Sequence, residues 1–410
     1  MRPALRLVAV LMVLAVASAG LAAISPPQEA PPPVPEKPKA PAAPPLREVT
    51  PEELARSREA RLARERAALE SELARIESFG RVEEFRDALR ELGKRCDEFP
   101  PGTERWVEVA GGWLPMMAVD HWLLWHLPAE GRELPVAVDF EQPHHPFAAI
   151  VDLSVQLHAH DVELLMVVFP SRVQLEPELV LPQLGELAPD RFRGMVGATT
   201  RFLLALNGRG VETVNLAPPF VEARKVKRDD GVNGDLYLAR NKHWTPRAAE
   251  LAARAVAERV REMPWFVPGV AQEGVDFELV PKTLPFTSTA GGQAPDRTPE
   301  KVEFRQIRQT GPDVNRFDER RSPIVVLSDS FAKFYSEEGQ SSSFVDHLRR
   351  FTGWPIDAIT PMGGGELQCR QALAQRGDKL RGKKVVIWLM QEDNLRPIRG
   401  FRPVDVFAGR

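Results

Sequence analysis

Short apolar runs recur along most of the chain, and they contain few polar positions. A strand with one face in water alternates apolar and polar residues, whereas a strand covered on both faces reads as a continuous apolar run. The runs therefore predict buried strands of a mostly parallel sheet. They lie at residues 135–140, 162–169, 211–216, 323–327, 354–359 and 384–390.

Segments with helical spacing of apolar residues separate these runs. The predicted helices are at residues 146–159, 189–208, 245–262, 342–352 and 366–379. Strands that alternate with helices are typical of a sheet with helices on both faces. The sequence therefore predicts an α/β fold, a three-layer α/β/α sandwich.

Residues 264–320 interrupt this alternation. They are rich in Pro, Gly and charged residues, which is typical of surface connections. We predict an insertion there, with one short hairpin, near whichever site the sheet builds.

Residues 1–24 have the pattern of a secretory signal peptide. Arg2 and Arg6 precede an apolar stretch, and small residues such as Ala17 and Ala19 come near its end. This order directs export, so we expect a periplasmic or other extracytoplasmic location. The apolar stretch is also almost as long as the roughly 20 residues that a membrane anchor needs. Cleavage and anchoring to the inner membrane therefore remain alternatives.

A linker and a helical stalk are predicted next. Residues 25–46 consist mostly of Pro and Ala, and proline fixes φ and lacks a backbone N–H, so this linker is extended. Residues 47–95 are predicted to form a charged helix that begins at Thr50, with Pro51 in its first turn.

The apolar seam of this stalk is only half filled. One set of positions seven apart is apolar and the set between them is charged: Ala55, Leu62, Leu69 and Ile76, against Arg58, Glu65 and Glu72. A stable coiled coil needs both sets to be apolar. We therefore expect a helix that lies on a partner or on its own domain.

The net charge and the cysteine content exclude few classes of function. The chain has 54 basic and 57 acidic side chains among 410 residues, a formal charge of −3, which gives no support for nucleic-acid binding. Cys96 and Cys369 either pair or stay apart and buried, and both alternatives are open.

A candidate nucleophile follows the predicted strand at 323–327. The sequence there is "VVLSDSF", with Ser328, Asp329 and Ser330. Such residues often cap helices, but α/β enzymes also place a nucleophile at the carboxyl end of a strand. Asp329 adjoins Ser330 and points elsewhere, so we expect it to cap the turn.

A candidate base lies in the loop before the helix at 245–262. His243 precedes Thr245, a good N-cap, and Pro246. Loops that enter helices lie at the same sheet edge as strand carboxyl ends. We therefore expect His243 and Ser330 to be within reach of each other.

These two elements resemble a known family. "NKHWT" before an Ala-rich helix, followed later by "SDSF" after a strand, is similar to the alginate O-acetyltransferase group (the AlgJ/AlgX type). Those proteins are SGNH-hydrolase-like, and their His element precedes their Ser element. "GGWLP", "VFPSRVQLEPE", "GGGELQCRQALA" and "KKVVIWLMQED" agree, so the resemblance covers residues 105–395.

The resemblance implies an acyl-transfer site without metal or cofactor. Ser330 would be the nucleophile, His243 the general base and Asn241 the residue that orients the imidazole. Secondary candidates are the oxyanion donors Gly364 and Gly365, the substrate clamp Arg370, and Tyr335 near the acyl group. The implied acceptor is an exported polysaccharide, and the implied acyl donor is a membrane-bound O-acyltransferase.

The sequence departs from the family pattern at two site positions. Asn241 stands where the family has Asp, and in a serine-protease triad that change costs about 10⁴ in turnover. Asp235 would replace it if the loop folds back. Ser328 stands where the family has Gly. Two alternative functions are therefore a carbohydrate acetyl esterase and a catalytically degenerate binding or scaffold protein.

The closely spaced histidines do not predict a metal site. His158 and His160 are two residues apart near a helix end, a spacing that does not converge on one ion. We predict capping or surface roles for them.

Overall fold

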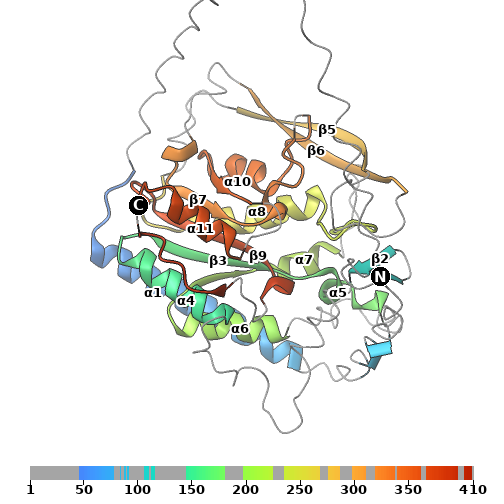
Figure 1. The fold of residues 1–410 in the computed structure, drawn as a ribbon, viewed down its shortest axis with the longest axis horizontal. Coiled ribbons are helices and arrows are strands. Elements are labelled where there is room, and N and C mark those ends of the chain that lie inside the picture. The colour runs from blue at the N-terminus through green and yellow to red at the C-terminus, as the bar shows by residue number, and fades with distance from the viewer. Residues whose placement is uncertain are drawn as a thin grey trace, which may run out of the picture. The chain divides into compact units, whose positions relative to one another are not determined.

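A five-stranded parallel sheet lies at the centre of the structure (Figure 1). The computed structural model describes residues 46–77, 84, 87–88, 90–91, 106–109, 112–115, 145–180, 197–224, 235–267, 276–286, 298–310, 319–337, 339–361, 366–395 and 401–408. All of them fall within one unit, Ala40–Arg410. The predicted signal or anchor, nearly all of the linker and the strand at 135–140 lie outside the described residues.

The strands occur in the order β4-β3-β9-β7-β8, and each neighbouring pair is parallel. They are β3 (Glu163–Phe169), β4 (Glu212–Asn215), β7 (Ile324–Leu327), β8 (Asp357–Ile359) and β9 (Val385–Gln391). Four of them lie within a predicted apolar run, and β9 extends one residue beyond the run predicted at 384–390. All residues of β3, β7 and β9 are buried, because helices cover both faces. β9 is the last strand in sequence, yet it pairs with both β3 and β7.

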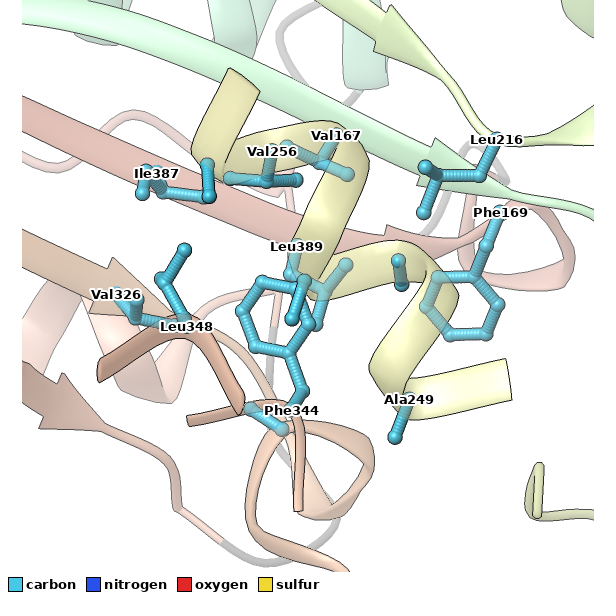
Figure 2. Packing of buried hydrophobic residues seen from close by; sticks show 14 of the residues in the cluster. Val167, Phe169, Leu216, Ala249, Val256, Val326, Phe344, Leu348, Ile387 and Leu389 are labelled. Atoms are coloured by element: carbon cyan, nitrogen blue, oxygen red, sulfur yellow. The ribbon is translucent and has the colours of Figure 1, made fainter. Parts of the chain in front are cut away.

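Alternate residues of each strand face different helix layers. Leu165 and Val167 of β3 pack with α7, α8 and α10, whereas Leu164 and Met166 pack with α4, α6 and α11. These helices are α4 (Pro146–His158), α6 (Gly197–Gly208), α7 (Ala217–Arg224), α8 (Pro246–Arg261), α10 (Phe344–Thr352) and α11 (Gln368–Gln375). Figure 2 shows the α8 and α10 side of the sheet. The predicted three-layer sandwich is confirmed.

Shorter elements complete the fold. They are α5 (Arg172–Leu175), α9 (Ser330–Lys333), the 3₁₀ turns at Pro177–Leu179, Glu319–Arg321 and Glu392–Asn394, and the antiparallel pair β1 (Trp106–Val109) and β2 (Gly112–Pro115).

Helix α1 (Pro51–Glu77) packs on its own domain, one of the two placements left open by the sequence. Arg61 is buried and lies 2.7 Å from both Glu163 and Glu212, at the amino ends of β3 and β4. Glu65 accepts hydrogen bonds from Thr213. The charged seam position Glu65 and the neighbouring Arg61 thus contact the polar edge of the sheet, so a charged residue at position 65 of the seam has a partner on the domain.

The segment expected to hold a short hairpin forms a long one. β5 (Asp276–Phe286) and β6 (Glu300–Thr310) are antiparallel strands of 11 residues each. Val302 and Phe304 pack with Leu238 and Tyr335, so the hairpin lies against the segments that carry the candidate site.

Within the described ranges, no helix is both long and apolar enough to cross a membrane.

Candidate active site

Ser330 is the first residue of α9, at the carboxyl end of β7. Asp329 is the N-cap of α9, and its carboxylate accepts a hydrogen bond from the Phe331 N–H at 3.0 Å. Asn394 also donates to Asp329, at 3.3 Å. Asp329 therefore caps the turn, as the sequence predicted.

His243 lies in a narrow loop that leads into α8. Hydrogen bonds close the loop between Leu238 N and His243 O at 3.1 Å and between Thr245 N and Leu236 O at 2.9 Å. The Thr245 hydroxyl caps α8, with Pro246 as the first helical residue. The loop therefore presents His243 at the carboxyl edge of the sheet, where β7 ends.

Ser330, His243 and Asn241 form a connected triad. Ser330 Oγ is 2.8 Å from His243 Nε2, and His243 Nδ1 is 2.7 Å from Asn241 Oδ1. Asn241 Oδ1 also accepts the backbone N–H of His243 at 3.0 Å, which identifies it as the carbonyl oxygen. Nδ1 must then carry the proton, and Nε2 accepts from the serine hydroxyl.

The histidine is poised as a neutral base. His243 is 4% exposed. Burial, together with the charge of Lys242, lowers the pKa of His243 to about 3. The neutral form that takes a proton is thus fully populated at pH 7, whereas the imidazolium is disfavoured.

Asn241 orients the imidazole without contributing charge. Its Nδ2 is buried, with no hydrogen-bond partner among the described residues. Asn241 already occupies Nδ1, so Asp235, an alternative considered from sequence, is not the orienting residue. Asp235 instead accepts the Thr245 hydroxyl through its backbone carbonyl at 2.6 Å.

Two hydrogen bonds join the histidine loop to the nucleophile turn. Trp244 Nε1 donates to the Phe331 carbonyl at 3.1 Å, and the Tyr335 hydroxyl donates to the Trp244 carbonyl at 3.2 Å. Tyr335 is buried, so its hydroxyl ties the two segments together. The structure therefore corrects the assignment of Tyr335 to the acyl group.

Two charged residues hold the peptide groups of the histidine loop. Glu300 of β6 accepts the N–H groups of Ala239 at 2.7 Å and Arg240 at 2.6 Å. Arg172 donates from the other side to the carbonyls of Leu238 and Ala239, both at 3.3 Å. Arg172 lies in the family-like segment "VFPSRVQLEPE" but is not marked there as a site residue, and no periodic pattern marks Glu300.

Arg370 does not lie where a substrate clamp is needed. Its side chain is 1% exposed and donates to the carbonyls of Glu366 at 2.8 Å and Arg402 at 3.1 Å. The guanidinium lies over Trp388, in the helix layer opposite α8. Its role is structural, which corrects the sequence assignment.

The predictions about the oxyanion glycines and the cysteine pair fall wholly or partly on residues that the structure does not describe. Gly364 and Gly365 lie outside the described residues, as does Cys96. Cys369 is buried in α11, and burial raises the pKa of its thiol to about 12. Both alternatives for Cys96 and Cys369, paired or apart, stand as the sequence left them. Ser328 is fully buried, and its Oγ has no hydrogen-bond partner in the described part of the chain.

A cavity of about 600 Å³ lies at the other edge of the sheet. It is lined by Arg58, His158, Glu163 and Lys384 among others, next to the amino ends of β3 and β9. Burial lowers the pKa of His158 to about 4, so this histidine is neutral at pH 7. The described residues contain no group of three or more His, Cys, Asp or Glu side chains arranged to hold a metal ion.

A parallel sheet between helix layers, with a Ser–His pair at its carboxyl edge, defines an SGNH-hydrolase-like protein. The chain belongs to the family described as "SGNH hydrolase-like domain, acetyltransferase AlgX", whose sequence profile matches residues 117–392.

Named relatives agree with this family. The chain is 22% identical to "Probable alginate O-acetylase AlgJ" of Pseudomonas fluorescens over 67% of its own length and 66% of that protein. It is 26% identical to "Alginate biosynthesis protein AlgX" of Pseudomonas syringae pv. tomato, over 38% of this chain and 32% of that protein. The match thus spans just under two thirds of the first relative and about a third of the second.

A solved structure is also similar. The O-acetyltransferase domain of Pseudomonas putida AlgJ matches with a TM-score of 0.49 and 17% identity, over 72% of this chain and 92% of that one.

Proposed function

We propose that this chain is a polysaccharide O-acetyltransferase that works through a covalent acetyl-serine. The observation that carries the proposal is the 2.8 Å contact between Ser330 Oγ and His243 Nε2, with Nδ1 held by Asn241. A hydroxyl, a neutral imidazole and an orienting acceptor in line are what nucleophilic acyl transfer needs. The family and the names of the relatives favour acetyl as the group and a polysaccharide as the acceptor.

The first half-reaction loads the serine. His243 Nε2 takes the Ser330 proton as Oγ attacks the acetyl carbonyl, and a tetrahedral oxyanion forms. The Ser330 N–H, at the start of α9, is our first candidate oxyanion donor, and the amides of Gly364 and Gly365 are further candidates. The intermediate collapses, the donor leaves with the proton from His243, and acetyl-Ser330 remains.

The second half-reaction removes the acetyl group from Ser330. A sugar hydroxyl gives its proton to His243 Nε2 and attacks the acetyl-serine carbonyl. Collapse releases the acetylated sugar, and Ser330 Oγ recovers the proton. If water replaces the sugar, the same steps make the protein an esterase.

The proposal also includes an extracytoplasmic location for the protein and a membrane partner that supplies the acetyl group. The pattern of residues 1–24 supports export, with the acceptor polysaccharide met outside the cytoplasm. An acetyl group must then cross the inner membrane, for which a membrane-bound O-acyltransferase is the proposed donor partner. Tethering through the N-terminal segment is proposed on the same pattern.

The neutral Asn241 favours a second candidate, a family member with little or no turnover. Asn holds the imidazole but does not offset the charge of the imidazolium. Such a protein would bind polysaccharide without acetylating it.

One experiment separates these functions. The purified full-length chain is given an activated acetyl ester with and without oligosaccharide acceptors, and Ser330→Ala is the control. Acetyl-Ser330 detected by mass spectrometry, with transfer to the sugar, supports the transferase. Acetate release that ignores the sugar indicates an esterase. No release that depends on Ser330 means that the enzyme proposal is wrong.

A further inference from the structure

The ring of Phe334 lies flat against the imidazole of His243. Their centroids are 3.8 Å apart and their planes differ by 3°. Phe331 contacts the same imidazole with centroids 4.6 Å apart, but its plane is tilted by 39°. Phe334 therefore presents the electron-rich face of a benzene ring to the base, and Phe331 presents that face less directly.

The site needs a source of stabilisation for a positive charge at His243. The imidazolium forms in each half-reaction, in a buried place, and Asn241 brings no charge. Lys242, in the same loop, opposes the imidazolium.

The nearby carboxylates are committed to other groups. Asp329 accepts from Phe331 N and Asn394, and Glu300 accepts from the N–H groups of Ala239 and Arg240. The hydroxyl of Tyr335, which follows Phe334, donates to the Trp244 carbonyl. None of these recorded hydrogen bonds reaches the ring of His243.

We propose that Phe334 is a positioning residue whose π face stabilises the His243 imidazolium, where a carboxylate at position 241 would otherwise do so. A cation over an aromatic face gains stability that corresponds to about three-fold to thirty-fold in an equilibrium constant, more when both are shielded from water. The catalytic consequence rests on the proposed function, but the electrostatic effect on His243 does not.

The chain holds Phe334 in this place from two sides. Phe286, from the hairpin, meets it in a T-shaped contact with centroids 5.4 Å apart, and Tyr335 meets it at 4.8 Å and 75°. Tyr335 adopts a φ of 75°, which is unfavourable for a bulky side chain. The Tyr335 hydrogen bond to Trp244 and the packing of its ring under the hairpin offset that cost. The turn that aims Phe334 at the base is thus fixed by tertiary contacts.

Fluorinated phenylalanines test the proposal, because fluorine withdraws density from the ring face and barely changes its size. We would place 4-fluoro-, 3,5-difluoro- and 3,4,5-trifluorophenylalanine at position 334 of the full chain. With an activated acetyl ester, kcat should fall at each step, by about three-fold to thirty-fold over the series, and KM should stay constant. The same series at Phe407, whose ring stacks on His160 with centroids 3.7 Å apart and packs with the helix layer on the other face of the sheet, should leave kcat unchanged.

A second readout does not depend on turnover. In Asn241→Asp protein, the new carboxylate raises the pKa of His243, and NMR of the imidazole nitrogens follows its titration. The pKa of His243 should decrease in steps as fluorine is added at position 334. Phe334→Leu, which keeps apolar bulk, should lower the pKa as well.

The outcomes are distinguishable. A constant pKa and kcat along the series, or equal effects at positions 334 and 407, would overturn the role of Phe334. A rise in the pKa of His243 in Phe334→Leu would also overturn it, because the ring would then only exclude water. If the pKa shifts but no variant turns over ester, the proposed function fails and the inference about Phe334 stands.

Discussion

At the scale of single residues, Asn241 determines both how well the imidazole of His243 is oriented and how little its positive charge is stabilised. Its Oδ1 receives two N–H groups, from the ring and from the backbone of His243, so the imidazole is well oriented. The same atom carries no charge to balance the imidazolium. Orientation and charge stabilisation, which one aspartate supplies in most triads, are separated here.

We predict that Asn241→Asp raises turnover by at least about ten-fold, because the carboxylate keeps the hydrogen bond and adds charge. The measurement is kcat with an activated acetyl ester, and Asn241→Ala, which removes the orientation, is expected to lose activity. Equal rates for Asn and Asp would show that charge at this position does not limit the reaction.

The buried histidine also predicts an unusual pH dependence. Because the pKa of His243 is lowered to about 3, the base stays neutral when the pH falls through 6.5, the usual histidine range. We expect kcat/KM for an activated ester to show no histidine inflection between about pH 5 and pH 8. A loss of kcat/KM on the acidic side centred near pH 6.5 would contradict this. In Asn241→Asp protein the carboxylate raises the pKa of His243, so activity should be lost at a higher pH than in the unchanged chain.

At the scale of elements, the carboxyl edge of the sheet and the β5–β6 hairpin together position the candidate site. The sheet brings Ser330 and the histidine loop together, and the hairpin holds that loop through Glu300 and covers Phe334 through Phe286. An element outside the central sheet therefore determines how firmly the catalytic base is placed.

Removal of Glu300 should lower kcat more than it changes KM. Glu300→Ala leaves two partly buried N–H groups of the loop without this acceptor, and the loss for each approaches the about 1–3 kcal/mol of a buried group only as far as water is kept away. We expect kcat to decrease about ten-fold or more, with Glu300→Gln, which keeps one acceptor, in between. Glu303→Gln on the same strand, whose recorded partner is Lys301, is the matched control and should match the unchanged chain in both rate and thermal unfolding.

The sequence predicted the elements well where the pattern is local. Continuous apolar runs such as "ELLMVVF" identify strands that are buried on both faces, and topology then places Ser330 near His243. The long hairpin was missed because Pro281 and Pro285 of β5 argue against a strand. Glu300 and Phe334 were missed because their contacts join segments far apart in sequence, and neither residue belongs to a motif.

At the scale of the whole molecule, α1 is joined to the sheet by buried charge. Arg61 is 1% exposed and lies between Glu163 and Glu212 at the amino ends of β3 and β4. Arg259 of α8 contacts Glu65 of α1 and Glu212 of β4, so α1, β3, β4 and α8 share one network.

We predict that Arg61→Ala destabilises the protein by about 3–5 kcal/mol, because buried Glu163 loses its ion-pair partner and Glu212 keeps only Arg259. The free energy of unfolding is measured by urea denaturation. Arg64→Ala on the same helix is the control. Its ion pair with Glu262 is solvent-exposed, so the change should cost less than about 1 kcal/mol. A loss for Arg61→Ala as small as the one expected for Arg64→Ala would mean that the buried charges of α1 contribute little to the stability of the domain.

The central place of β9 has a consequence for how the protein matures. β9 is the last of the described strands in sequence, yet it alone bridges β3 and β7 within the described sheet. Until it inserts, the half that carries Ser330 shares no ladder with the half formed by β3 and β4. Parallel pairing between strands so distant in sequence forms late. A chain that leaves the ribosome amino end first would therefore stay open and inert until β9 arrives, and such an open chain would also suit the proposed export.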